Sequence, residues 1–153
     1  MTDVVRLGVR ELSERLQRRE LSALEVTEAF LGRIRETDGT HSHDGDPGSI
    51  NAWVRVYEED ALAAASRAEA RLGETVVGRE GQAPLLTGVP IGLKDLYGVA
   101  GKPVTASSGF FEEVPGADCD AWSRLSAAGM VLLGHLHTHE FAVGGTTDQV
   151  GSP

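Results

Sequence analysis

The chain has 153 residues, of which 41% are hydrophobic, and a formal net charge of −9 at pH 7. This length suffices for one domain with a substantial core, and the acidic balance argues against nucleic acid and anionic membranes as partners. The single cysteine, Cys119, excludes an intrachain disulfide. Because residues 1–19 contain no continuous apolar run, they predict neither a signal peptide nor a membrane anchor. We expect a cytoplasmic protein.

Two helices are predicted near the N-terminus. In residues 8–19, apolar side chains recur at helical spacing. A second helix begins at Ser22, where Glu25 three residues later completes the pattern of a capping box. Residues 38–49 are polar and rich in glycine, which predicts a surface loop.

The middle and C-terminal parts alternate strands with helices. Residues 50–57 alternate in the manner of a strand, and the alanine-rich residues 58–72 predict a helix that ends at Gly73. A further helix is predicted over residues 118–128, with Gly129 as its stop, and a short apolar strand over residues 130–133. Helices that alternate with short buried strands indicate a layered α/β fold.

Lys94 is the strongest candidate for a catalytic residue. It closes the run Gly88–Lys94, whose period of two predicts a strand with small residues on one face. Such small residues let another backbone or a ligand approach closely. The chain uses twelve arginines but only two lysines, Lys94 and Lys102. Arginine stays protonated, whereas a desolvated lysine can lose its proton, so we expect Lys94 to be a buried, switchable amine.

A second candidate site consists of His135, His137 and His139. On a strand these side chains would point the same way and could bind a divalent metal as neutral imidazoles. The pattern resembles the first-strand metal motif of metal-dependent amidohydrolases, which are TIM barrels. In that family the motif lies near the start of the catalytic domain, and here few residues follow it. The metal site is therefore kept as an alternative to histidines that line a strand end without metal.

The string GVPIGLKDL at residues 88–96 resembles the lysine motif of the amidase signature family. The resemblance continues through residues 99–108, which are similar to the loop that follows the motif, and residues 118–134, which are similar to the next helix and strand. Residues 138–144 resemble the segment before the family's serine-rich signature. The N-terminal half is also similar to the family's usual opening. The resemblance implies a layered α/β/α fold with a mixed central sheet.

The same resemblance implies a hydrolase of amide bonds with a Ser-cisSer-Lys triad, in which Lys94 is the lysine. A neutral amine would take a proton from the nucleophilic serine through the bridging serine and return it to the leaving amine. Backbone N–H groups of the serine-rich loop would form the oxyanion hole. The implied partner is a small-molecule amide, with no cofactor. The chain departs from the family at His135, where lysine is common, and at His137, where asparagine is common.

The resemblance also predicts how the domain is organised. Residues 1–73 would be a helical N-terminal region with one strand, and residues 74–153 the start of the catalytic core. Both catalytic serines belong to a Gly/Ser-rich signature that is expected shortly after Pro153. We therefore expect the 153-residue chain to be an N-terminal portion of an amidase domain and to be inactive alone. The chain also contains Ser107, Ser108 and Ser152, but these lie at motif positions where they cannot replace the two catalytic serines.

Two further functions remain as alternatives. The glutaminase subunit of tRNA-dependent amidotransferases shares the lysine motif, but often carries asparagine where this chain has Leu96. That difference favours a free-standing amidase. The other alternative is a non-catalytic binding domain that kept the fold and lost the serines.

Overall fold

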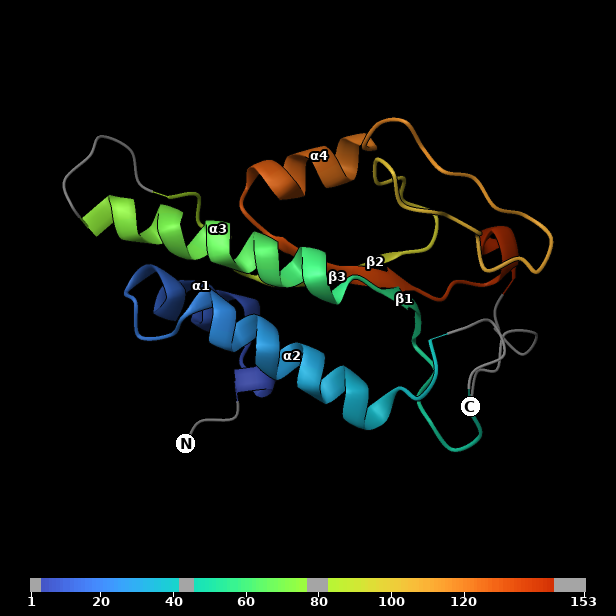
Figure 1. Cartoon of the computed structure of the whole chain (residues 1–153), viewed down its shortest axis with the longest axis horizontal. Helices are drawn as coiled ribbons and strands as arrows, with labels where there is room; N and C mark the ends of the chain where they lie inside the picture. Colours follow the sequence, from blue (N-terminus) through green and yellow to red (C-terminus); the bar gives the residue numbers. More distant parts are fainter. Residues whose placement is uncertain (1–3, 42–45, 77–82, 145–153) are drawn as a thin grey trace. The chain divides into compact units, whose positions relative to one another are not determined.

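The computed structural model describes residues 4–41, 46–76 and 83–144 (Figure 1). Its elements, in chain order, are η1 (Val4–Arg6), α1 (Val9–Gln17), α2 (Ala23–Thr37), β1 (Trp53–Val56), α3 (Glu58–Val76), β2 (Pro90–Lys94), α4 (Asp120–Ala127), β3 (Val131–Leu136) and η2 (Glu140–Ala142). None of the helices in these ranges combines the length and apolar character that a membrane span needs. The alternation of helices and strands confirms the predicted α/β class.

The described residues group into two compact units. The first contains residues 4–33, 57–76, 83–91 and 125–133. The second contains residues 34–41, 46–56, 92–124 and 134–144.

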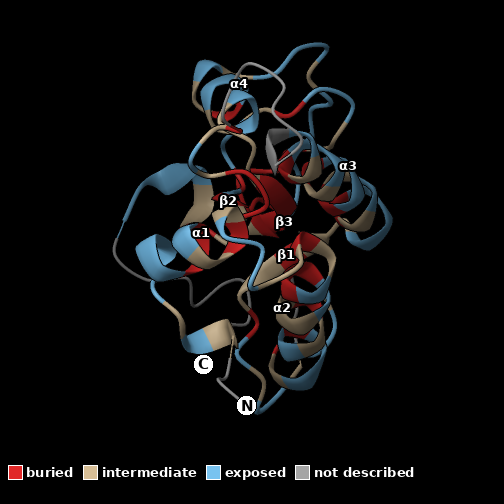
Figure 2. Cartoon of the chain, turned by 90° about the vertical axis from the view of Figure 1, so that its left-hand side faces the viewer, coloured by how far each residue is buried: buried red, intermediate tan, exposed pale blue. Residues whose placement is uncertain are grey.

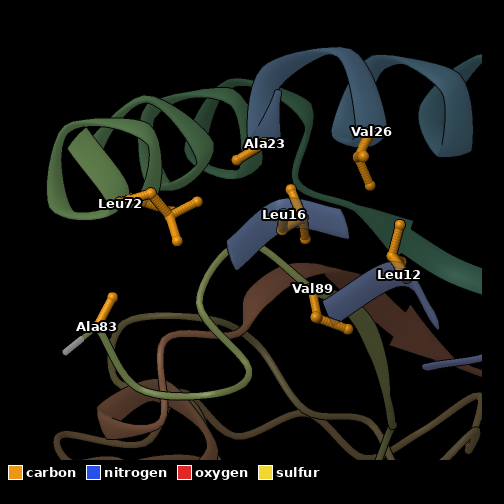
Figure 3. Close-up of a cluster of buried hydrophobic side chains, with 8 residues drawn as sticks. Leu12, Leu16, Ala23, Val26, Leu72, Ala83 and Val89 are labelled. Carbon is orange, nitrogen blue, oxygen red and sulfur yellow. The ribbon is translucent and has the colours of Figure 1, made fainter. Parts of the chain in front are cut away.

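The first unit has an apolar core of eight buried side chains, most of them on α1, α2 and α3 (Figure 3). Its members are Leu12, Leu16, Ala23, Val26, Ala68, Leu72, Ala83 and Val89. Leu12 and Leu16 lie one helical turn apart, so both reach the same side of α1. The chain turns at Gly88 with φ +85°, and a Cβ there would lie 2.9 Å from the Ala23 Cβ, so this turn requires glycine.

The N-terminus of α2 has the predicted capping box. The Ser22 hydroxyl accepts hydrogen bonds from the backbone N–H groups of Leu24, at 3.2 Å, and Glu25, at 3.5 Å. In return, the Glu25 carboxylate accepts the Ser22 N–H at 3.3 Å. The Ala23 N–H is bound by Glu69 of α3 at 2.7 Å, so N–H groups that the helix leaves unpaired are satisfied by side chains.

Glycine ends α4 but not α3. The N–H groups of Gly129 and Met130 donate to the carbonyls of Ser126 and Leu125, which is the bonding pattern of a Schellman motif, and Gly129 has φ +91°. The prediction that α3 ends at Gly73 is wrong, because the helix continues to Val76. At Gly73 an added Cβ would lie 3.0 Å from the Arg19 guanidinium. Glycine therefore makes room for a tertiary contact inside the helix.

The three strands form a mixed sheet in the order β1-β3-β2. β1 is antiparallel to β3, with Arg55 opposite His135. β2 runs parallel to β3, because the Val131 N–H donates to the Val89 carbonyl at one end and the Asp95 N–H donates to the Leu136 carbonyl at the other. The central strand β3 is buried from its first residue through His135 (Figure 2).

Two strand boundaries differ from those predicted. β1 begins at Trp53 rather than at residue 50, because the buried Asp38 carboxylate accepts the N–H groups of Ala52, at 2.6 Å, and Trp53, at 3.0 Å. β3 is longer than predicted and extends to Leu136, so His135 is a strand residue.

Candidate active site

Lys94 is the last residue of β2. Its neighbours Leu93 and Asp95 are buried, whereas Lys94 itself is exposed. This alternation follows from strand geometry, in which successive side chains point to opposite faces. Lys94 is thus solvated in this structure, and the expected burial of its amine is not found. Directly after it the chain turns, since the Tyr97 N–H donates to the Lys94 carbonyl at 3.0 Å.

The small residue Gly92, two positions before Lys94, makes room for side chains of the sheet rather than for a ligand. A Cβ at Gly92 would lie 2.7 Å from the Trp53 ring and 2.9 Å from the Leu136 Cδ1 atom. Leu136 comes from β3, the neighbour of β2, and Trp53 comes from β1, the next strand beyond it. The glycine in the lysine motif therefore serves close packing over the sheet.

Asp95 is fully buried and joins the end of β2 to the loop that follows. Its Oδ2 atom accepts the Thr105 N–H at 3.1 Å and the Ser107 N–H at 3.3 Å, and it also accepts the Thr105 hydroxyl. A carboxylate can accept about four hydrogen bonds, so these donors are within its capacity.

Ser107 connects that loop to the chain after β3. Its hydroxyl accepts the Thr138 N–H at 2.9 Å and lies 3.3 Å from the His137 Nδ1 atom. Ser107 and Ser108 are each only 2% exposed, so a substrate cannot reach either hydroxyl in this structure. Ser152 lies outside the described residues.

The three histidines have separate environments. His135 is fully buried; its Nε2–H donates to the Tyr97 carbonyl at 3.1 Å, and its Nδ1 lies 3.8 Å from the Asp95 carboxylate. His137 contacts Ser107, and His139 precedes η2, with its ring against Gly144. Because β3 ends at Leu136, the strand alternation that would align the three imidazoles stops after the first.

Burial lowers the pKa of His135. The nearby Asp95 charge and the carbonyls of Tyr97 and Pro103 act in the opposite direction, but burial dominates. Within residues 4–41, 46–76 and 83–144, no group of three histidine, cysteine, aspartate or glutamate side chains could hold a metal ion. The geometry of the described residues thus gives the metal-site alternative no support.

Comparisons with known proteins agree with this architecture. The family model described as Amidase matches residues 25–152. An amidase from Pseudomonas putida is 39% identical over 153 residues, covering 100% of this chain and 30% of that protein. One subunit of the glutamyl-tRNA(Gln) amidotransferase of Geobacter metallireducens is 37% identical over 139 residues, covering 90% of this chain and 26% of that protein.

Two solved structures are similar in fold as well as in sequence. The peptide amidase of Stenotrophomonas maltophilia superimposes with a TM-score of 0.69 at 28% identity, over 89% of this chain and 26% of that one. A protein from a vestigial complex linked to the origins of an s-triazine catabolic enzyme superimposes with a TM-score of 0.77 at 30% identity, over 94% of this chain and 29% of that one.

The chain belongs to the amidase family, as its lysine motif predicted. It spans 30% of the length of the Pseudomonas amidase and about a quarter of the amidotransferase subunits that it matches.

Proposed function

We propose that this protein hydrolyses amide bonds of small molecules and that Lys94 is its catalytic base. The observation that carries the proposal is the place of Lys94. It ends a strand of the sheet, within a motif that lies inside the region matched by the amidase family model. The similarity to a Pseudomonas amidase over 100% of the chain supports the same chemistry.

The proposed reaction starts with a neutral Lys94 amine. The amine takes a proton, relayed by a bridging serine, from a nucleophilic serine, whose oxygen then attacks the amide carbon. The proton returns to the leaving nitrogen as the C–N bond breaks, and water hydrolyses the resulting acyl ester. The two serines are expected from the family's Gly/Ser-rich signature, since Ser107 and Ser108 are buried.

The exposure of Lys94 adds one requirement to this proposal. Proton transfer to a lysine requires a neutral amine, and desolvation disfavours the charged form of an amine. When a substrate or the serine segment covers the end of β2, the charged form loses its hydration and the neutral amine is favoured. On this proposal the base becomes competent only in the assembled site.

Exchange of each lysine in turn tests the proposal. The protein expressed from its complete gene is assayed for release of ammonia or amine from a panel of amides. We expect Lys94→Ala to lower kcat/KM by about 10³-fold or more, as removal of a general base and its relay does. The matched control is Lys102→Ala, which removes the chain's other lysine and should leave kcat/KM within about twofold. If Lys94→Ala kept the kcat/KM of the unchanged protein, as Lys102→Ala should, Lys94 would not be the catalytic base.

Glutamine hydrolysis within a tRNA-dependent amidotransferase is the second candidate. Several subunits of glutamyl-tRNA(Gln) amidotransferases are 32–38% identical to the chain, which favours this function. The half-exposed Leu96 stands where those subunits often carry asparagine, which favours a free-standing amidase. Ammonia release from glutamine that requires the other amidotransferase subunits would decide for the second candidate, and hydrolysis of other amides by the protein alone would decide for the first.

A further inference from the structure

Asp95 lies next to Lys94 in the chain but has no step in the proposed reaction. Its side chain is fully buried and accepts hydrogen bonds from two residues of the following loop, Thr105 and Ser107. We propose that Asp95 is a positioning residue, which clamps residues 105–107 against the end of β2 and so fixes the backbone from which Lys94 projects. The inference rests on the proposed role of Lys94 and adds to it a residue that the lysine motif alone does not explain.

The chemistry of this position requires a carboxylate. A buried charge is costly unless donors surround it. Here the Thr105 N–H, the Thr105 hydroxyl and the Ser107 N–H all point at one carboxylate, and the His135 ring lies beside it at 3.8 Å. Asparagine has nearly the same shape, but the Thr105 N–H lies 3.3 Å from Oδ1 and 3.1 Å from Oδ2, so the NH₂ group would meet this donor in either orientation of the amide. The loop and the carboxylate are therefore matched to each other.

The loop needs such a clamp because its backbone is strained. Ala106 and Ser107 both have left-handed backbone angles, with φ of 52° and 51°. Residues with a Cβ rarely adopt this conformation, and it persists only where surrounding contacts enforce it. Asp95 supplies contacts on one side, and the Thr138 N–H bonded to the Ser107 hydroxyl supplies one on the other. The Phe141 N–H, which donates to the Ala106 carbonyl at 3.0 Å, adds a third.

The clamp reaches Lys94 through the main chain. The Asp95 N–H donates to the Leu136 carbonyl at 2.8 Å, which continues the ladder with β3 past the last residue of β2. Lys94 is thus followed by a residue fixed through both its backbone and its side chain. Because Lys94 and Asp95 point to opposite faces, Asp95 acts on the direction of the lysine and not by contact with the amine.

The labelling of the two lysines tests this proposal without any need for turnover. A limiting amount of an amine-acetylating reagent is added to the folded protein, and the ratio of modified Lys94 to modified Lys102 is measured by peptide mass spectrometry. Every molecule carries its own reference, since the chain has only these two lysines. We expect Asp95→Asn to shift the ratio by about threefold or more in either direction, because the backbone from which Lys94 projects is no longer held in place. Asp118→Asn is the matched control, since this exposed carboxylate accepts one N–H, from Ala100, in the same unit.

A second pair of variants separates the clamp from general damage. Thr105→Val removes the hydroxyl donor at nearly constant shape, and Thr105→Ser retains it. We expect the valine variant to change the ratio as Asp95→Asn does, and the serine variant to match the unchanged protein. If Asp95→Asn does not fold, as judged by circular dichroism, the Thr105 pair decides. A ratio that stays constant in a folded Asp95→Asn or Thr105→Val protein would overturn the clamp.

Turnover gives the second readout. In the amide assay, we expect Asp95→Asn to lower kcat about 10²-fold while KM stays within about twofold, because a displaced base weakens the chemical step more than substrate binding. If Lys94→Ala leaves turnover unchanged, the proposed role of Lys94 as base fails, and the labelling ratio still judges the clamp. If Lys94→Ala abolishes turnover and Asp95→Asn leaves kcat unchanged, only the positioning role fails.

Discussion

The Nδ1 atom of His135 lies 3.8 Å from the Asp95 carboxylate, and both side chains are fully buried. A titratable imidazole on the central strand thus stands beside the carboxylate that holds the loop after Lys94. The second unit thus contains a buried polar pair, and the net charge of this pair changes when His135 gains a proton.

Stability should therefore fall as the pH drops below about 6.5, the ordinary pKa of histidine. Burial lowers the pKa of His135 in the folded protein, so the unfolded chain binds a proton at a pH where the folded chain does not. The stability from neutral His135 is complete above 6.5 and is lost as the pH falls toward the lowered pKa of the folded state. Urea unfolding across this range should show a steeper loss for the unchanged protein than for His135→Gln. If the free energy of unfolding fell equally with pH in both proteins, the lowered pKa of His135 would not be the cause of the loss.

Gly92→Ala should destabilise the protein by about 1–3 kcal/mol, the usual cost of overpacking. The new methyl group would lie 2.7 Å from the Trp53 ring and 2.9 Å from Leu136, and both side chains would have to shift. The control is Gly109→Ala, where a Cβ meets nothing within 4 Å, and its effect should stay within about 0.5 kcal/mol. Chemical denaturation measures both. Equal effects of the two substitutions would show that the space beside Gly92 can relax.

Ser22→Ala should cost about 1 kcal/mol of the free energy of unfolding. It removes the hydroxyl that accepts the N–H groups of Leu24 and Glu25 at the start of α2. Ser66→Ala, at an exposed position of α3, is the comparison and should be neutral or slightly stabilising, since alanine favours helix. Thermal unfolding followed by circular dichroism would distinguish them, and a neutral Ser22→Ala would show that Glu69, bonded to the Ala23 N–H, suffices as the cap.

Residues 1–153 produced alone should show no Lys94-dependent amide hydrolysis. The described residues supply the proposed base, but Ser107 and Ser108 are buried and hydrogen-bonded within the loop or nearby chain. Assay of the purified chain with the same amide panel checks this. Turnover that disappears in Lys94→Ala would mean that a nucleophile lies within these residues.

The sequence predicted the features that depend on local patterns. The capping box at Ser22 and the end of α4 at Gly129 follow from neighbouring residues, and both are confirmed. Gly73 follows the same local rule, but the helix continues past it to Val76, and this glycine instead makes room for Arg19, more than fifty residues away in the chain. Long-range packing is the part that a local pattern does not contain.

The candidate active site also has features that consecutive residues predict and features that depend on long-range packing. The lysine motif is recognisable from consecutive residues, and the family it predicted is confirmed, while the role of Lys94 stays a prediction. The exposure of Lys94 and the burial of Asp95 depend on which face of β2 is covered. The sequence did contain one sign that Asp95 is buried, because Asp95 continues the alternation of the apolar residues Val89, Ile91 and Leu93. A carboxylate in phase with buried side chains indicates a buried acceptor, whose donors the following loop then supplies.

The carboxylate of Asp38 has a consequence for association between copies of the chain. It occupies the N–H groups of Ala52 and Trp53 at the start of β1, which lies at one edge of the sheet that the described residues form. An incoming strand would need free donors there to extend the sheet. With these two already bonded to a buried side chain, the start of β1 is a poor template for pairing. Asp38 thus sets where the strand begins and leaves fewer backbone donors there for a second copy to pair with.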